Sequence, residues 1–492
     1  MEQQLERLRR ENEQLAVEKR ILELKVQKLQ RQLWEKKSER MPADDKQGML
    51  FREAAAEKPV ATPAATKSVR DPGKPRAPKG PKPLDPALPR EVIQVPAPDL
   101  KALICPVTNK PMVPGFVERI EVLARRAPEY YVKAYERTVF VSPAKTAPVY
   151  APWPADILPR SRVHASVVAH IAAAHYCEHL PFNRIEQQLA RTGVDLARSS
   201  QVSLMAQLDR LVEPLLVALK TEVFASGYVQ VDATPIDVCD PERPGKVREA
   251  TLWAYRAKKG AVWFEYQASK SPKHPDATLK AVNFAGYCQT DGAQGLGSIG
   301  PPDRVKSLGC HAHSRRYFFE AHQAGDPRAQ WYLDRFGKLF RVEQLAQRHG
   351  RREVLRRRIS RPLFQAMLAQ AEKHAQVAPA KTGLGDAVRY LLDQQERLER
   401  CLSELEAELS NNGVERAIRP LKLGARNWLF VGDPKAGPRL ANLFTLVENC
   451  RLLDIDPERY LIDLIGRLAD HPASKIAELL PHHWQGAPSA AA

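Results

Sequence analysis

Three acidic residues have types and positions suited to metal-assisted chemistry. Asp232 lies inside an alternating apolar stretch, Asp291 ends a second such stretch, and Glu415 follows a pair of asparagines. Carboxylates are ligands that hard divalent cations prefer, and two such cations about 4 Å apart support phosphodiester cleavage and transfer. Asp232, Asp291 and Glu415 are therefore the candidate catalytic and metal-binding residues.

Other interpretations of the acidic residues remain open at this point. Asp237, Asp240 and Glu265 compete for the positions on the sheet, but they lie on turns or farther along strands. Glu415 stands beside Arg416, and a Glu–Arg pair of this kind is commonly a surface ion pair.

The elements that must position these acids can be read from residue 227 onward. Three alternating stretches, YVQVDATPIDV, ATLWAYRA and AVWFEYQAS, predict strands, and DATLKAVNF predicts a helix. A fourth strand ends at Asp291, and VKSLGCHAHSRRYFFEAH predicts a further strand that runs into a helix. This order is that of a ribonuclease H-like fold, so we predict an α/β core of this kind over residues 227–450.

Glu415 is expected on a helix that delivers the third acid to the sheet. Asn411 or Asn412 would be its N-cap, and Pro420 would limit its length. The residues between Asp291 and Glu415 predict a large helical insertion at about 320–405. Its arginine-rich run, 348–361, is either a solvated face or a phosphate-binding surface.

The charge of the chain favours a polyanionic partner, and nucleic acid is the commonest one. Lys and Arg together number 75 against 58 acidic residues, which gives a net charge of +17. Trp428 could stack on an unpaired DNA base or belong to the core. The side chains expected to contact DNA phosphates are Arg315, Arg316, Arg416, Arg419, Lys422 and Arg426.

The N-terminal region predicts self-association. Residues 1–40 carry leucines at heptad spacing, which predicts a leucine-zipper coiled coil and a homodimer or higher oligomer, although a heteromeric zipper fits the same pattern. Residues 41–100, rich in Pro, Ala, Lys and Arg, predict a disordered basic linker. The heptad leucines are Leu8, Leu15, Leu22 and Leu29.

Two small regions are expected between the linker and the core. Residues 101–160 predict a β module that resembles a degenerate zinc ribbon, because Cys105 has no cysteine near it to complete a site. Residues 161–226 predict helices that form either a helix-turn-helix-like DNA-binding region or a scaffold. Residues 451–492 are expected to form a C-terminal helical tail. Cys310, His311 and His313 lack a matching second pair, so no zinc site is expected.

The sequence also bears on the compartment of the protein. It has no apolar run near 18 residues and no apolar stretch at its N-terminus, which argues against a spanning helix and a secretory signal. Its seven scattered cysteines are typical of thiols in a reducing cytosol. We therefore expect a cytoplasmic location.

The chain resembles transposases of the insertion sequence 66 family, of the Asp-Asp-Glu type. The matching stretches include VDATPIDV, QTDG, CHAHSRRYF, NNGVERAIRPLKLGARNWLF and LANLFTLVENCRLLDIDPERYL, and the resemblance covers nearly the whole chain. It implies that Asp232, Asp291 and Glu415 are the catalytic triad. They would bind two Mg²⁺ ions, with Mn²⁺ as a substitute.

The resemblance further implies an activity and its partners. The expected reaction is cleavage at transposon ends followed by transfer of the 3′-hydroxyl into target DNA. Double-stranded DNA and accessory proteins of the same element would be the partners, and the location would be the bacterial nucleoid.

The sequence departs from the family pattern at several positions. Ala233, Ala293 and Ser410 replace residues that usually flank the triad, Ala425 interrupts the last basic stretch, and the paired cysteines are missing. Ala233 and the missing cysteines support an alternative to an active transposase, namely a catalytically silent DNA-binding regulator or structural partner derived from a transposase.

Overall fold

The structure is a computed structural model of the chain. It describes residues 84–96, 104–105, 108–126, 129–141, 147–154, 156–158, 161–258, 260–292, 295–378 and 382–486. The predicted coiled coil, 1–40, and most of the predicted linker lie outside these residues. Within the described part, the chain has a mixed α/β fold with two sheets.

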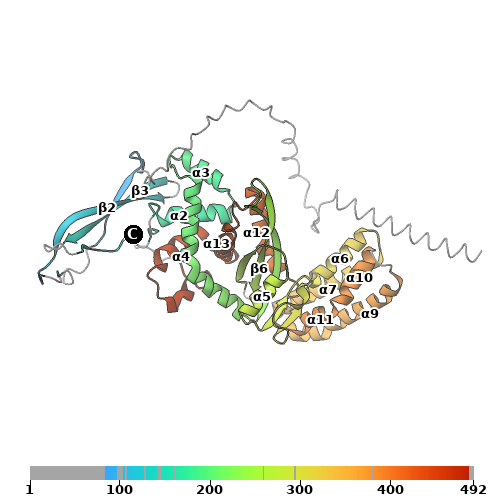
Figure 1. Cartoon of the computed structure of the whole chain (residues 1–492). Helices are drawn as coiled ribbons and strands as arrows, with labels where there is room; N and C mark the ends of the chain where they lie inside the picture. Colours follow the sequence, from blue (N-terminus) through green and yellow to red (C-terminus); the bar gives the residue numbers. More distant parts are fainter. Residues whose placement is uncertain are drawn as a thin grey trace, which may run out of the picture. The chain divides into compact units, whose positions relative to one another are not determined.

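A mixed five-stranded sheet is formed by strands β5 to β9, and helices lie beside it (Figure 1). Its strand order is β7-β6-β5-β8-β9. Strands β5, β6 and β7 pair antiparallel. Strand β8 pairs in parallel with β5, and β9 pairs in parallel with β8. The bounds are β5 Tyr228–Cys239, β6 Val247–Ala257, β7 Val262–Gln267, β8 Gly286–Gln289 and β9 Val305–Leu308.

These strands fall where the alternating stretches predict them. The helix between β7 and β8 is α5, Lys273–Ala281, and β9 runs into α6, His311–Gln323. One detail differs from the expectation, since β8 ends at Gln289 and Asp291 lies in the loop that follows. Gly292 turns this loop with a φ of 76°, a conformation that glycine adopts without a steric penalty.

Helix α13, Ala436–Leu452, covers the free edge of the sheet. The side-chain oxygen of Asn449 accepts a hydrogen bond of 3.0 Å from the backbone N–H of Val262, and Asn449 Nδ2 donates one of 2.7 Å to the Val262 carbonyl. Thr445 Oγ1 accepts a bond of 3.0 Å from the backbone N–H of Phe264. These buried side chains satisfy strand groups that an exposed edge would leave unpaired.

The chain between β9 and the Glu415 helix is helical and packs around a core of its own. Phe318, Phe336, Phe364 and Leu391 are among the buried side chains of this second core. Figure 1 shows these helices gathered together. After α6 they are α7 Arg328–His349, α8 Arg352–Leu355, the π-helix η4 Arg356–Ser360, α9 Arg361–Val377, α10 Gly383–Asp393 and α11 Gln395–Ser403.

His311 links α6 to α11 inside this second core and makes stability depend on pH. Its Nε2 donates a hydrogen bond of 3.0 Å to the Leu398 carbonyl, and burial lowers its pKa to about 4. The unfolded chain binds this proton near pH 6.5, so stability is full above that pH and falls as the pH drops toward 4. The loss is on the order of 3 kcal/mol.

We expect His311→Gln to flatten the fall in unfolding free energy between pH 6.5 and 4, measured by denaturant titration at several pH values. The glutamine amide keeps a donor but binds no proton. His322→Gln, on the exposed face of the same helix, is the matched control and should keep the wild-type slope. Equal slopes for all three proteins would contradict the assignment.

The region before the central sheet contains a smaller sheet. Strand β3, Glu129–Val141, pairs antiparallel with β2, Val113–Arg126, and with β4, Val149–Tyr150. Strand β1, Arg90–Gln94, pairs parallel with β3. Residues 90–94 are thus part of a sheet and not of a linker. Ile93 is half-buried while its neighbours Val92 and Gln94 are exposed, as expected for alternate faces of a strand.

The helices of 161–226 are mostly packed against the core. They are α2 Ala165–Ala172, the π-helix η2 Ala173–Cys177, α3 Phe182–Arg191 and α4 Arg198–Ala225. Helix α4 begins after Ala197, which occupies the N-cap position and makes no side-chain capping bond. No helix of the described residues is long and apolar enough to cross a membrane.

Candidate metal and DNA site at the centre of the sheet

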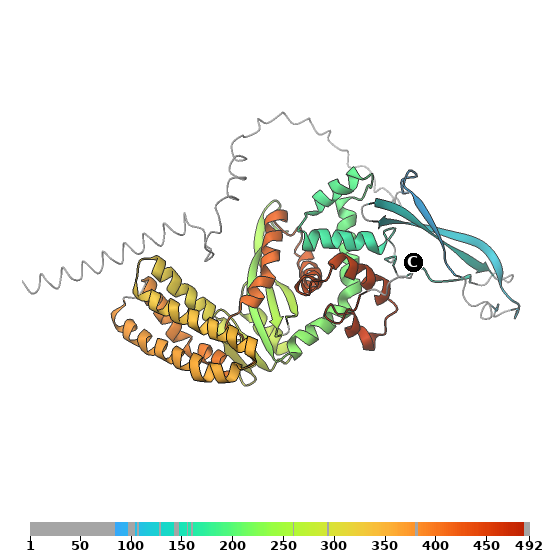
Figure 2. The same cartoon turned by 180° about the vertical axis from the view of Figure 1, so that it is seen from behind.

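The structure brings Asp232, Asp291 and Glu415 to the same region of the central sheet. Asp232 lies on β5, Asp291 follows β8, the parallel neighbour of β5, and Glu415 lies in the first turn of α12, Asn412–Trp428. Helix α12 packs against β5 and β6 and lies along the sheet in Figure 2. Two strands and one helix therefore position the three acids.

The charges of these acids act on one another. Burial, followed by the negative charges of Asp291 and Glu415, raises the pKa of Asp232 to about 7. A hydrogen bond of 2.8 Å from the Ala233 backbone N–H and the charge of Lys422 oppose this rise. A bound cation would relieve the same repulsion, and an all-oxygen donor set fits Mg²⁺.

His313 is a further neighbour of Glu415. Its Nε2 lies 3.6 Å from Glu415 Oε1, and its ring is mostly buried. From the sequence, His313 was considered only as one possible metal ligand of a Cys-His-Ala-His motif, together with Cys310 and His311. In the structure the motif separates, because His311 faces the helical core while His313 faces Glu415.

Gln230 fixes the start of α12 relative to the sheet. It lies two residues before Asp232 on β5, is fully buried, and shares that strand face. Its Oε1 accepts a hydrogen bond of 3.0 Å from the Val414 backbone N–H, and its Nε2 donates one of 2.9 Å to the Ser410 carbonyl. The residue before Glu415 is thus tied directly to the strand that carries Asp232.

Gln289 on β8 holds the chain that leads into α12. Its Nε2 donates hydrogen bonds of 2.8 Å to the carbonyls of Glu408 and Gly309. Its Oε1 accepts from the buried Tyr228 hydroxyl at 2.5 Å and from Gln230 Nε2 at 3.0 Å. Tyr228, Gln230 and Gln289 therefore form one buried network. Asp232 and Asp291 each lie two residues after a member of it, and Val414, the neighbour of Glu415, is hydrogen-bonded to Gln230.

Gly413 is needed where α12 approaches the sheet. A Cβ at this position would lie 2.5 Å from Arg256 Nη1 and 2.6 Å from Gln230 Oε1. Gly413→Ala is therefore expected to lower the free energy of unfolding by about 1–3 kcal/mol, as overpacking does. Chemical denaturation measures this change.

Gly337 provides the matched control for Gly413. It lies inside α7, where a Cβ would meet nothing within 4 Å. Gly337→Ala should raise stability by about 0.5–1 kcal/mol through helix propensity. Stabilisation by both substitutions would show that position 413 has room for a side chain.

Helix α10 supports the loop that carries Asp291. The Tyr390 hydroxyl donates a hydrogen bond to the Asp291 carbonyl, and the Tyr390 ring stacks on Tyr317 of α6 with ring centroids 4.5 Å apart. A Cβ at Gly292 would lie 2.8 Å from Gln394 Oε1. The helical region thus contacts the sheet site, which the sequence pattern did not reveal.

Two expectations about α12 are wrong in detail. Asn411 occupies the N-cap position, but its side chain makes no capping bond, and its buried side-chain oxygen and nitrogen have no hydrogen-bond partner. Pro420 does not limit the helix, which continues to Trp428. Buried contacts through Ala417, Ile418 and Leu421 hold the helix on the core and outweigh the lost backbone bond.

Most of the predicted DNA-contacting cations of α12 share its exposed side. Their spacing of three or four residues places them along one helix face. Arg416, Arg419, Lys422 and Arg426 are all exposed. On α6, Arg316 is exposed, 3.8 Å from Glu320, and Arg315 is half-buried.

Trp428 and the competing acids have structural contacts. Trp428 is half-buried against the main core, and its ring centroid lies 6.4 Å from that of His175. Glu265 accepts hydrogen bonds from Tyr255 at 3.1 Å and Thr278 at 2.8 Å, and Asp240 pairs with Arg243 at 2.8 Å. Asp237 is exposed farther along β5. The charges that raise the pKa of Asp232 are those of Asp291 and Glu415.

Only part of this arrangement could be found from sequence. Gln230 and Asp232 are two residues apart on a predicted strand, and alternate residues of a strand share a face. This spacing could have indicated that Gln230 lies beside the candidate acid. Tyr390, Gln394 and His313 had no such signal, since their contacts join elements distant in the chain.

Comparison with known proteins places the chain in a family. Residues 160–439 match the family model described as Transposase IS66 family, and residues 445–482 match the IS66 C-terminal element. Residues 21–93 match the model described as Transposase C of IS166 homeodomain.

Curated relatives from Sinorhizobium fredii are similar over most of their length. Uncharacterized protein y4hP is 28% identical and the match covers 95% of this chain and 89% of the relative. Uncharacterized protein y4qI is also 28% identical, with 76% and 71% covered. Because the first family model alone spans more than half of the sequence, the chain belongs to the IS66 family of transposases.

Proposed function

We propose that this protein is a DNA transposase of the Asp-Asp-Glu type that cleaves transposon ends and transfers the 3′-hydroxyl into target DNA. The observation that carries the proposal is the convergence of Asp232, Asp291 and Glu415 at the central sheet. Burial raises the pKa of Asp232, and the charges of Asp291 and Glu415 raise it further. The strand order β7-β6-β5-β8-β9, with an acid on β5 and another after β8, supports a ribonuclease H-like core.

The three carboxylates would hold two Mg²⁺ ions. When bound, the ions would activate the attacking water or 3′-hydroxyl and stabilise the departing oxygen. The chain itself supplies the positions of the ligands. Gln230 and Gln289 hold the start of α12 over the sheet, and Tyr390 holds the Asp291 loop.

The exposed cations of α12 would bind the DNA backbone beside these acids. Lys422 is close enough to Asp232 to lower its pKa, so a phosphate near Lys422 would lie near the metal site. Arg416, Arg419 and Arg426 would extend this contact along the helix. Trp428 has a packing role in this proposal, because its ring lies against the core.

The assembly is proposed from the sequence and the family. Two protomers joined through the N-terminal heptads would bring two DNA ends together, and accessory proteins of the same element would be further partners. The reaction would take place on bacterial DNA in the cytoplasm. Light scattering of the full chain and of a chain lacking residues 1–40 tests the dimer.

A cleavage assay tests the proposed reaction. Full-length protein is incubated with a labelled duplex that carries the terminal repeat of its element, with Mg²⁺, Mn²⁺ or chelator. We expect a nick at the end of the repeat with either metal and none with chelator. Specific binding of the duplex without a nick in either metal would instead support the silent DNA-binding protein.

A further inference from the structure

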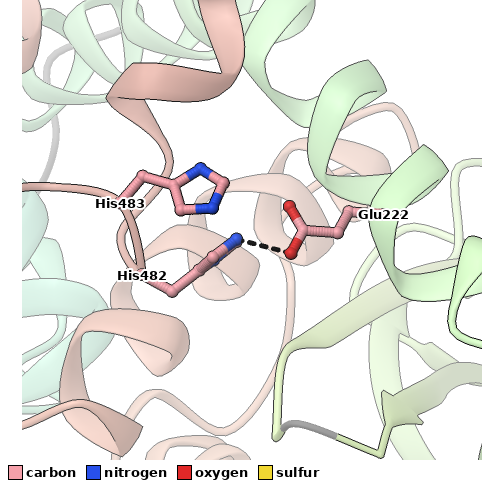
Figure 3. Close-up of side chains that lie close together, drawn as sticks. All are labelled: Glu222, His482 and His483. Atoms are coloured by element: carbon pink, nitrogen blue, oxygen red, sulfur yellow. Dashed lines mark ion pairs between the residues drawn. The ribbon is translucent and has the colours of Figure 1, made fainter.

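A second group of potential metal ligands lies outside the candidate catalytic site. Glu222 stands in the last turn of α4, and His482 and His483 follow the 3₁₀ helix η5, Ala473–Leu479. The three side chains offer ligand atoms that all lie within 4.8 Å of one another. Figure 3 shows them converging from α4 and from the C-terminal segment.

His482 is placed as a metal ligand would be. Its Nε2 lies 2.6 Å from Glu222 Oε1, yet neither ring nitrogen makes a hydrogen bond of acceptable geometry, and both nitrogens are shielded from solvent. Shielded ring nitrogens without hydrogen bonds are costly. A cation shared between His482 and Glu222 would remove that cost.

His483 has one ring nitrogen committed and the other available. Its Nδ1 lies 2.8 Å from the Ala477 carbonyl, which can only accept, so Nδ1 carries the proton. The lone pair of Nε2 is therefore left for a metal ion. A backbone carbonyl that holds the second ring nitrogen is the usual support of a metal-binding histidine.

The backbone around the two histidines is fixed before any ion binds. Leu479 and Leu480 are buried, and the Tyr460 hydroxyl donates a hydrogen bond of 2.7 Å to the Leu479 carbonyl. On the other side, Trp484 Nε1 donates one of 2.8 Å to Asp463. Ligands held in this way lose little freedom on binding, which favours affinity.

We propose that Glu222, His482 and His483 form a binding site for a zinc-class divalent cation that ties the end of α4 to the C-terminal segment. Two imidazoles and one carboxylate suit Zn²⁺, whereas Mg²⁺ prefers oxygen ligands alone. A water would fill the fourth position. The site is separate from the Asp232 site, and the proposal does not depend on transposase activity.

The test is a Zn²⁺ titration of the full-length protein after chelation and removal of the chelator. Calorimetry counts the equivalents bound, and thermal unfolding with and without Zn²⁺ gives the shift in Tm. We expect His483→Gln and Glu222→Gln each to bind one equivalent fewer in the range of wild-type affinity. Loss of a ligand should weaken this site by more than about 100-fold, since loss of a supporting contact alone costs 10- to 100-fold.

His471→Gln is the matched control. His471 lies on the same C-terminal segment and approaches one acid, Glu478, at 3.7 Å, without a second histidine. It should keep the wild-type equivalents and the wild-type Tm shift. When Mg²⁺ replaces Zn²⁺, wild type and all variants should show the same binding and the same Tm shift.

Two results would overturn the proposal. One is that His483→Gln and Glu222→Gln, shown by circular dichroism to be folded, bind as many equivalents of Zn²⁺ as wild type with equal affinity. The other is an equal Tm shift in all proteins. Either would show that His482 and Glu222 form an ion pair and that any bound Zn²⁺ lies elsewhere.

Discussion

Asp232→Asn, Asp291→Asn and Glu415→Gln are each expected to lower the rate of Mg²⁺-dependent end cleavage by on the order of 10³-fold or more. Each substitution replaces a charged metal ligand with a neutral amide of the same shape. When residues act as one unit, removing any one of them loses nearly the whole rate enhancement. The measurement is the single-turnover rate of nicking on the terminal-repeat duplex, with DNA binding followed in parallel.

Asp237→Asn is the control for these variants. Asp237 lies on the same strand, but it is exposed and takes no part in raising the pKa of Asp232. It should cleave at the wild-type rate. Wild-type cleavage by Asp291→Asn or Glu415→Gln would refute the assignment of the triad.

The same Asp232→Asn variant should be more stable than wild type when no metal is present. Asp232 is mostly buried and faces two like charges, so its ionised form destabilises the fold at neutral pH. Removing the charge should raise the free energy of unfolding by about 1–3 kcal/mol, in keeping with the trade-off between stability and activity. A stable but inactive protein would separate a chemical role from a folding defect.

Arg356→Met is expected to cause the largest loss of stability among the substitutions considered. The Arg356 side chain is 1% exposed. Its guanidinium donates two hydrogen bonds of 2.8 Å to Glu343. It also donates to three backbone carbonyls, at 2.8 Å to Cys401, 2.7 Å to Glu404 and 2.7 Å to Ala407. Breaking a buried pair costs about 3–5 kcal/mol.

Arg357→Met is the control, because Arg357 is the exposed neighbour of Arg356 in the same arginine-rich run. Its unfolding free energy should stay within about 0.5 kcal/mol of wild type. Denaturant titration measures both variants. If the two substitutions had equal small effects, the arginine run would be a solvated face along its whole length.

Arg356→Met should also reduce cleavage, because Arg356 holds the chain that enters α12. Its carbonyl partners, Cys401, Glu404 and Ala407, belong to the segment that leads to Glu408. Gln289 of the central sheet donates a hydrogen bond to the Glu408 carbonyl. Loosening this segment would displace Glu415. Arg357→Met provides the same control in the cleavage assay.

The sequence by itself located the strands along the chain and singled out the acids that we propose carry the chemistry. Alternation of apolar residues located β5, β6 and β7, because each strand has a buried face whatever surrounds it. Asp232 stood inside one predicted strand, Asp291 at the end of another, and Glu415 at the start of a predicted helix. The family followed from the same stretches.

Only the tertiary structure decided how these acids are held. Local rules predicted that Asn411 or Asn412 would cap α12 and that Pro420 would limit it. In the structure Asn411 makes no capping bond, and the helix continues to Trp428. In the sequence, nothing distinguishes Arg356 from its exposed neighbours. Only long-range packing buries it and lets it donate hydrogen bonds to backbone carbonyls. The physical reason is shared: a buried polar group must find its partners in space, and those of Gln230 and Gln289 lie on distant segments of the chain.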